Sequence, residues 1–382
     1  MIWLIPAAYA CLLVAVIYRF SHLRPQLHDY APTPTGPMVS IIIPARNEAD
    51  NIEACVRSVL TTAYEPFELI AVDDRSTDET AAILERLAQS HEARGRLRVV
   101  RGEDLQPGWY GKPWAIEQGY RIARGELLLF TDADTDHTPE LLSRAVAALR
   151  KERVGLVSVL SRQAMVSFWE RLLQPQVLFA LASRAGNLER INRTRTVWNA
   201  VASGQYILTT RADYEAIGRH ASVRDTVVED LALAQTYVRH GLDIFLVHGV
   251  EYMTTRMYRS LGAIVEGWSK NLALGVPQMF PPLPLVRRAA PWTMWLPSLA
   301  WIVPPALWAL YGWPWAALTT LVSVGIWMAV HHAVGAPLRY ALLYPLGAAL
   351  VAYIMLRSAW RGPGKVEWRG RIYTEGSGVT TP

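Results

Sequence analysis

The middle of the chain alternates short β-branched runs with stretches whose apolar residues recur at helical spacing. This alternation is typical of a mainly parallel sheet covered by helices on both faces, so the sequence predicts an α/β fold. We expect strands over 39–43, 67–72, 97–100, 126–130 and 154–159, and helices over 50–62, 78–89 and 139–150. Ligands bind such sheets beyond the carboxyl ends of the strands, so the polar residues that follow each strand form the candidate site.

Two long apolar regions lie outside this alternation. Residues 2–20 carry no charge before Arg19, lack a small-residue cleavage site and are long enough to cross about 30 Å of hydrocarbon. We therefore predict a retained membrane anchor. The second region runs from 289 to 356, with breaks near 311–314 and 331–339, and predicts three hydrophobic segments. Prolines in the first of these favour a re-entrant or interfacial segment.

These patterns divide the chain into five parts. We predict an N-terminal transmembrane anchor over 1–24, a short linker over 25–37, an α/β domain over 38–285, a membrane region of two or three hydrophobic segments over 286–358 and a basic tail over 359–382. Basic residues adjoin both membrane-facing ends of the α/β domain, which favours the cytoplasmic side. The chain is thus predicted to be an integral protein of the cytoplasmic membrane with a cytosolic α/β domain.

The net charge, the two cysteines and the apolar residues 165–186 bear on the possible partners, the compartment and the fold. The net charge of +5 comes without a basic helix or a zinc-finger spacing, so a nucleic-acid partner is not expected. Cys11 in the anchor and Cys55 in a predicted soluble helix do not pair, so no oxidising compartment is required. Residues 165–186 are mostly apolar and form either a core helix pair broken at Pro175 or an amphipathic element at the membrane interface.

Polar residues follow the first two predicted strands. Pro44, Arg46 and Glu48 lie where a loop can meet a nucleotide, although an ordinary strand-to-helix turn explains them equally. Asp73 and Asp74 end the second strand, where carboxylates can accept hydrogen bonds from a uracil ring or a ribose. The alternative is a helix-capping cluster, a role better suited to Thr77 or Asp78.

A pair of acids and a lysine come next. Asp132 and Asp134 follow an apolar strand, and hard cations such as Mg²⁺ or Mn²⁺ prefer oxygen ligands while bridging to phosphates. We expect this pair to hold a divalent metal and a donor's diphosphate. Lys112, within the run Gly108 to Ala115, would present a cation to the same diphosphate; the alternative is a glycine-rich turn with buried aromatics.

The last candidates lie further along the chain. Asp230 and Glu229 open a predicted helix over 231–240; an inverting sugar transfer needs one base, for which we predict Asp230, with Glu229 as the second choice. Gly204 and Gln205 lie either in a small-residue loop near the sugar or at a strand edge. Arg256 and Arg259 would face a departing diphosphate from one side if their segment is helical.

The order of these motifs over residues 38–275 resembles family 2 glycosyltransferases with the GT-A fold, a Rossmann-like nucleotide-diphospho-sugar transferase domain. The run GWYGKPWA and the flanking apolar segments resemble the membrane-bound branch that contains ceramide glucosyltransferase-like, hopanoid-associated and carotenoid glycosyltransferases. By this resemblance, Asp74 binds the nucleotide, Asp132 and Asp134 belong to the metal and diphosphate site, Asp230 is the base, and Arg256 and Arg259 contact diphosphate or acceptor. Ser260 stands where that branch has a tryptophan, so Trp268 is the tentative acceptor-stacking residue.

The sequence therefore predicts inverting, metal-dependent transfer of a single sugar from a nucleotide-diphospho-sugar. A UDP-sugar is favoured over a GDP-sugar, and the acceptor is a hydroxyl of a carotenoid, hopanoid or sphingolipid-like lipid. A single transfer fits better than polymer synthesis because the C-terminal membrane region is short for a polymer channel. Transfer to a polyprenyl phosphate is the nearest alternative, and a non-catalytic membrane scaffold is the alternative of another class.

Overall fold

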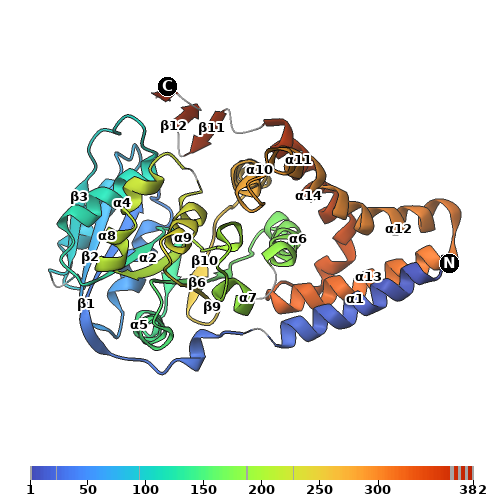
Figure 1. Ribbon diagram of the computed structural model, residues 1–382, viewed down its shortest axis with the longest axis horizontal. Coiled ribbons are helices and arrows are strands. Elements are labelled where there is room, and N and C mark those ends of the chain that lie inside the picture. Colours follow the sequence, from blue (N-terminus) through green and yellow to red (C-terminus); the bar gives the residue numbers. More distant parts are fainter. Residues whose placement is uncertain are drawn as a thin grey trace. The chain divides into compact units, whose positions relative to one another are not determined.

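The computed structural model describes residues 2–22, 24–93, 95–185, 188–226 and 228–361, and the backbone of three tail strands over 365–368, 371–374 and 377–380. The chain divides into two compact units. The sheet unit comprises Arg24–Arg162, Asn187–Met257 and Gly364–Pro382, and the helical unit comprises Met1–Leu23, Gln163–Gly186 and Tyr258–Pro363. Each is described by itself (Figure 1).

A seven-stranded sheet, in the order β3-β2-β1-β4-β8-β6-β9, forms the centre of the sheet unit. All neighbouring strands run parallel except β8, which is antiparallel to both β4 and β6. The predicted α/β class with a mainly parallel sheet is therefore confirmed. The strands are β1 (Thr35–Ala45), β2 (Glu65–Asp73), β3 (Leu97–Arg101), β4 (Leu127–Thr131), β6 (Leu156–Leu160), β8 (Tyr206–Thr210) and β9 (Ile244–His248).

Helices pack against this sheet and complete its core. The central strand β1 is buried continuously over Val39–Ile43, as expected for a strand covered on both faces. On α4, a Cβ at Gly119 would lie 2.6 Å from Ile42 and 3.1 Å from Val72, so this helix lies directly on β1 and β2. The helices of the unit are α2 (Ile52–Leu60), α3 (Thr80–Ala88), α4 (Gly111–Ile122), α5 (Leu141–Glu152), α7 (Leu188–Asn192), α8 (Arg211–Ala216) and α9 (Glu229–Arg239), with short 3₁₀ turns η2 (Val197–Asn199) and η3 (His220–Val223).

A second, three-stranded sheet lies next to the end of β4. Its order is β5 (Thr135–His137), β10 (Met253–Thr255) and β7 (Arg162–Gln163). β5 and β10 are antiparallel, with Thr255 opposite Thr135. This pairing brings the chain after β10 back to the loop that carries the predicted metal ligands. The tail strands β11 (Lys365–Trp368), β12 (Arg371–Thr374) and β13 (Ser377–Thr380) form a separate sheet.

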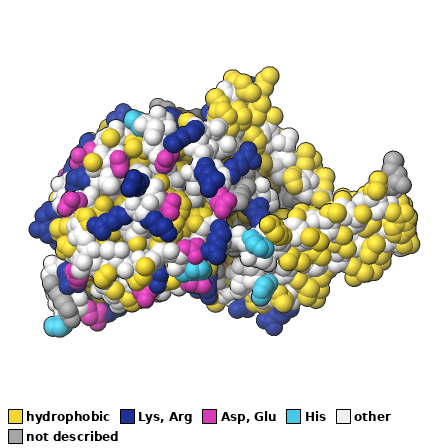
Figure 2. Space-filling model, turned by 60° about the horizontal axis from the view of Figure 1, so that its bottom comes forward, with side chains coloured by type: hydrophobic (Ala, Val, Ile, Leu, Met, Phe, Trp, Pro, Cys, Tyr) yellow, Lys and Arg dark blue, Asp and Glu magenta, His cyan; other side chains and the backbone are white. Residues whose placement is uncertain are grey.

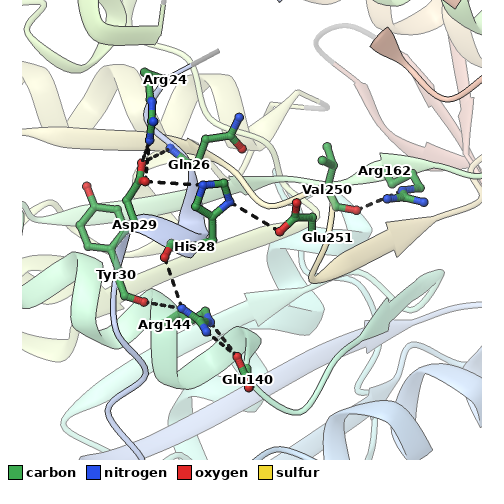
Figure 3. Close-up of polar contacts among 10 residues, drawn as sticks. All are labelled: Arg24, Gln26, His28, Asp29, Tyr30, Glu140, Arg144, Arg162, Val250 and Glu251. Carbon is green, nitrogen blue, oxygen red and sulfur yellow. Dashed lines mark hydrogen bonds and ion pairs between the residues drawn. The ribbon is translucent and has the colours of Figure 1, made fainter. Parts of the chain in front are cut away.

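The segment predicted as a linker is packed against the sheet unit (Figure 3). It contains the 3₁₀ turn η1 (Leu27–Asp29), and β1 already begins at Thr35. Leu27 is fully buried, the Pro25 carbonyl accepts a hydrogen bond from the His248 amide at 3.1 Å, and Arg144 donates to the Tyr30 carbonyl at 2.8 Å. The segment predicted as a short linker over 25–37 is therefore held by neighbouring elements through its few apolar residues and its backbone.

Among its described residues, the helical unit contains four helical segments that are long and apolar enough to span a membrane: 4–21, 284–311, 314–333 and 338–361. Hydrophobic side chains cover the visible face of α1, α12 and α13, with few charges among them (Figure 2). The breaks predicted near 311–314 and 331–339 are confirmed. The elements are α1 (Leu4–Ser21), α6 (Phe168–Ala185), α10 (Leu261–Gln278), α11 (Pro284–Thr293), η4 (Leu296–Ser298), α12 (Leu299–Tyr311), α13 (Pro314–Ala333), η5 (Leu338–Leu343) and α14 (Tyr344–Arg361).

Within this unit, helices from distant parts of the sequence pack together. α1 lies along α13 (Figure 1), and the Tyr9 hydroxyl donates to the Ala300 carbonyl at 2.5 Å. On α6, Gln176 donates to the Tyr344 carbonyl at 3.1 Å. Pro175 lies inside this continuous helix, so the predicted helix pair broken at that proline is wrong. Residues 163–186 and 258–285 thus belong to the helical unit, which differs from the predicted single domain over 38–285.

Candidate active site

The carboxyl ends of β1 and β2 form one rigid turn system. The guanidinium of the buried Arg46 donates to the carbonyls of Asp74 at 2.6 Å and Arg75 at 2.9 Å. Asn47, in a left-handed conformation with φ of 52°, accepts a hydrogen bond from the Thr77 amide at 2.8 Å. Arg46 therefore shapes the loop after β2 from inside. Pro44 is the penultimate residue of β1.

Of the acids at and after the end of β2, Asp73 and Asp74 belong to the turn, and Asp78 lies just before the start of α3. Asp73 is buried at the end of the strand and accepts a hydrogen bond from the Ser76 amide at 3.1 Å, while Asp74 is also buried and donates from its amide to Ala45 at 2.7 Å. Asp78 accepts from the amide and the hydroxyl of Thr80, at the start of α3. The predicted helix-capping role thus falls to Asp78.

Glu48 also belongs to this turn system. The side chain of Glu48 accepts a hydrogen bond from the Asn51 side chain at 2.8 Å, just before α2. Its amide donates to the Thr80 hydroxyl at 2.8 Å. Glu48 therefore joins the start of α2 to the start of α3.

Lys112 joins two elements by its ammonium group. Its Nζ lies 2.6 Å from Asp132 Oδ1, directly after β4, and 2.6 Å from Glu229 Oε1, at the start of α9. The lysine occupies the first turn of α4, which begins at Gly111, and its side chain is only 19% exposed. Burial by itself lowers the pKa of Lys112, but Asp132 and Glu229 more than offset this and raise it well above its ordinary value. The ammonium therefore stays charged.

The aromatic residues around Lys112 are structural. Trp114 is buried, packs against Trp109 with ring centroids 5.2 Å apart and lies beneath the Arg121 guanidinium. The run predicted as either a glycine-rich turn with buried aromatics or a cationic site contains both features.

Asp230 lies beside this ion pair in the first turn of α9. Its Oδ2 accepts a hydrogen bond from the Gly204 amide at 2.8 Å, and its Oδ1 accepts one from the Leu231 amide at 2.7 Å. Burial and the neighbouring Glu229 raise the pKa of Asp230 to about 6, against the opposing effect of Lys112. Such a carboxylate is poised to take a proton near neutral pH.

The backbone of Gly204 lies close to both Lys112 and Asp230. A Cβ built on it would lie 3.0 Å from Lys112 Nζ and 3.1 Å from Asp230 Oδ2. The loop before β8 must therefore carry a residue without a side chain to approach both charges. Gln205, the next residue, turns its side chain to Ser161 at 2.6 Å, and its carbonyl accepts hydrogen bonds from Asp132 and Thr131. Its backbone, rather than its side chain, supports the loop after β4.

Buried hydroxyl and imidazole groups support the loop that carries Asp132 and Asp134. Thr135 donates to the Asp132 carbonyl at 2.8 Å, and the buried His137 lies 3.1 Å from the hydroxyls of both Thr131 and Thr135. Burial lowers the pKa of His137 to about 3, so the ring is neutral and can share protons with these hydroxyls. His137 therefore supports the loop through these two hydroxyls.

The chemistry of this loop fits a hard divalent cation. In the described part of the chain no group of three His, Cys, Asp or Glu side chains is arranged to hold a metal. Phosphate oxygens and water are the usual complement for Mg²⁺ or Mn²⁺. Asp132 and Asp134 are thus candidates to hold a metal together with a diphosphate.

The structure places the remaining predicted residues in different settings. The Arg256 amide donates to the Asp134 carbonyl at 3.4 Å, so this residue lies beside the loop that carries Asp132 and Asp134. Arg259 and Trp268 belong to the helical unit. The segment from Arg256 to Arg259 is not helical, so the predicted shared helical face does not form.

Trp268 and Ser260 both have local roles within the helical unit. Trp268 is buried and donates to Gln174 at 3.3 Å. The Ser260 hydroxyl accepts a hydrogen bond from the Ala263 amide at 3.2 Å and caps α10. This cap gives a local reason for a serine where the resemblance leads one to expect a tryptophan.

Sequence reasoning therefore found Asp132, Lys112, Glu229, Asp230 and Gly204 separately, and the structure brings them together. It missed that Glu229 is a partner of Lys112. A glutamate in the first turn of a helix gives no sequence signal for a lysine more than a hundred residues away.

The chain is similar to known glycosyltransferases. Residues 40–218 match the model of glycosyl transferase family 2. The 4,4'-diaponeurosporenoate glycosyltransferase of Staphylococcus aureus is 32% identical over 245 residues, and the match covers 62% of this chain and 61% of that protein. The chain thus spans less than two thirds of the length of this relative.

A solved structure shares the fold. The mannosyltransferase PcManGT from Pyrobaculum calidifontis, in complex with GDP-Man and Mn²⁺, is 22% identical, with a TM-score of 0.58 and coverage of 94% of this chain and 99% of that one. With the parallel sheet, this likeness shows a GT-A fold. Within it, residues 40–218 match glycosyl transferase family 2.

Proposed function

We propose that this protein is an inverting glycosyltransferase of the cytoplasmic membrane, which moves a single sugar from a UDP-sugar to a hydroxyl of a lipid acceptor. One observation carries the proposal: Asp132, Lys112, Glu229 and Asp230 come from three separate elements and meet at the edge of the sheet. A carboxylate for a metal, a cation for a diphosphate and a base for a hydroxyl are among the groups this transfer requires.

Asp230 is the proposed base. Its carboxylate takes the proton from the acceptor hydroxyl as that oxygen attacks the anomeric carbon from the side opposite the diphosphate. The bond from the anomeric carbon to the diphosphate oxygen breaks, and the configuration at that carbon inverts. The nucleoside diphosphate leaves with the electron pair of the broken bond. The hydrogen bonds from the Gly204 and Leu231 amides fix both carboxylate oxygens.

The proposed donor contacts follow from the same geometry. Asp73 and Asp74 face the nucleoside from the end of β2, with Arg46 and Glu48 holding their loop in shape. Lys112 and Arg256 supply positive charge to the diphosphate, and Arg259 is proposed for the same purpose. A Mg²⁺ or Mn²⁺ ion held by Asp132 and Asp134 would neutralise charge on the leaving diphosphate.

The acceptor class rests on two further observations. Four helical segments are apolar and long enough to span a bilayer, and the relative from S. aureus is named for a carotenoid acid. A lipid that arrives along the membrane fits both. We propose a carotenoid, hopanoid or sphingolipid-like acceptor, with Gly204 and Gln205 as candidate contacts on the acceptor side.

A membrane assay tests the proposal. Membranes that contain the protein are incubated with radiolabelled UDP-glucose or GDP-mannose, Mn²⁺ and lipid extract, and products are separated before and after mild acid. We expect a neutral, acid-stable glycolipid made from the UDP-sugar. An acid-labile product would indicate a polyprenyl-phosphate acceptor, and the absence of both transfer and donor hydrolysis with every lipid and metal would favour the scaffold alternative.

The rate should fall in mildly acidic solution. Asp230 must be ionised to act as a base, and its pKa of about 6 means that kcat should decrease about tenfold for each pH unit below that value. The measurement is kcat between pH 8 and 5 with saturating donor, alongside UDP affinity over the same range. A kcat that stays constant down to pH 5 while UDP still binds would contradict the assignment of Asp230.

Adding one methyl group at Gly204 should also slow transfer. The new Cβ would come within 3.1 Å of Lys112 Nζ and Asp230 Oδ2, which displaces the base relative to the acceptor. We expect Gly204→Ala to lower kcat by roughly 10- to 100-fold, the range that small misplacements cost. Gly262→Ala is the matched control, because a Cβ there meets nothing within 4 Å; equal activity of the two variants would contradict the crowded site.

A further inference from the structure

One cation of the protein already contacts a carboxylate that is proposed to bind the metal. Lys112 Nζ contacts Asp132 Oδ1 at 2.6 Å, and Asp132 is one of the two proposed metal ligands. Its second contact, Glu229 Oε1 at 2.6 Å, comes from the helix that carries the proposed base. In this structure the lysine therefore neutralises Asp132, one of the two proposed metal ligands.

The local charges explain why an internal cation is required. Asp132, Glu229 and Asp230 all act on the one ammonium group, and Lys112 and Glu229 are largely shielded from water. Carboxylates gathered at such a site repel one another unless a cation lies between them. A divalent ion that took Asp132 would meet the ammonium at close range, so the two cations compete for the same oxygen.

We propose that Lys112 is an exchangeable placeholder for the metal. Without donor, its ammonium holds Asp132 and Glu229 and keeps free metal ions from binding. When the metal arrives with the nucleotide-sugar, the metal takes Asp132, and the ammonium stays on Glu229 and donates to the diphosphate. This inference rests on the proposed function and adds that the metal and the donor bind together. Glu229 is then a positioning residue for Lys112.

Metal binding in the absence of nucleotide tests the exchange directly. Mn²⁺ affinity is measured by electron paramagnetic resonance on the full-length protein in detergent, and UDP affinity is measured separately at saturating Mn²⁺. We expect Lys112→Met to bind free Mn²⁺ at least tenfold more tightly than the wild type, and to bind UDP at least tenfold more weakly. The gain should disappear in the double variant Lys112→Met/Asp132→Asn, which places the added site at Asp132.

Two further variants make the test specific. Arg57→Met removes a cation whose carboxylate partners, Glu53 and Glu92, lie on the exposed surface, and it should leave both affinities unchanged. Glu229→Gln leaves the ammonium only Asp132 as a partner, so free Mn²⁺ should bind more weakly than in the wild type while UDP also binds more weakly. The two site variants thus shift free-metal affinity in opposite directions.

The results separate this inference from the proposed function. If Lys112→Met has unchanged or weaker affinity for free Mn²⁺ while its melting temperature equals that of the wild type, the placeholder is overturned although the donor site stands. If Lys112→Met does not fold, an increase in free Mn²⁺ affinity in Glu229→Gln overturns it instead. A wild-type protein that binds no UDP with Mn²⁺ would overturn the proposed function itself.

Discussion

Asp230→Asn should lower kcat by roughly 10²- to 10⁴-fold, the usual contribution of a positioned general base. The amide side chain has nearly the shape of the carboxylate and can still accept the hydrogen bond from the Gly204 amide. It cannot take a proton, so the acceptor hydroxyl stays a weak nucleophile. The affinity for UDP with Mn²⁺ should change little, because the residue lies on the acceptor side of the reaction. Steady-state kinetics and calorimetric UDP binding measure the two quantities.

Glu229→Gln is the informative comparison for this variant. Because Glu229 holds Lys112, its loss should weaken donor binding, and kcat should fall less than in Asp230→Asn. Asp243→Asn, an exposed acid paired with Arg195 on the surface, should behave as the wild type. Should Glu229→Gln abolish turnover while Asp230→Asn remains active, the roles of the two neighbouring acids would be exchanged.

Asp132→Asn should remove metal-dependent donor binding. The substitution takes one anionic oxygen from the proposed metal site and leaves Lys112 with Glu229 alone. We expect UDP affinity in the presence of Mn²⁺ to fall on the order of 100-fold, since even the loss of a group that supports a ligand costs 10- to 100-fold in metal affinity. The measurement is UDP binding by calorimetry with Mn²⁺ and again with EDTA.

Asp136→Asn provides the control for that variant. Asp136 lies on β5, four residues further along the same loop, and its side chain is exposed. It should retain both UDP binding and the difference between Mn²⁺ and EDTA. If Asp132→Asn kept that difference, the metal would have to bind elsewhere.

The sheet could be predicted from the sequence because its strands are buried on both faces. The residues LLLF of β4 then form an unbroken apolar run, and the polar residues after it stand out. The acids at 73 and 132 were found in this way, whereas Asp230 was found at the start of a predicted helix. Their spatial meeting could only be expected from the topology of parallel sheets, which bring the carboxyl ends of strands to one edge.

Other features depend on contacts that the sequence pattern does not carry. The residues after the anchor look like a linker, yet Leu27 is buried and Arg144 binds the backbone of Tyr30. Pro175 predicts a helix break, but α6 continues through it and packs against α14. The pairing of Lys112 with Glu229 joins α4 to α9, and no periodicity links them. Long-range packing and ion pairing decided each of these cases.

The position of a bound Mn²⁺ ion tests the central claim most directly. Crystals of the full-length protein with UDP and Mn²⁺, measured at the manganese absorption edge, would give an anomalous peak for the metal. We predict one peak between the Asp132 carboxylate and the diphosphate of UDP, with the Lys112 ammonium moved from Asp132 to a phosphate oxygen. A peak away from Asp132, with Lys112 still bound to that carboxylate while UDP occupies its site, would contradict the account.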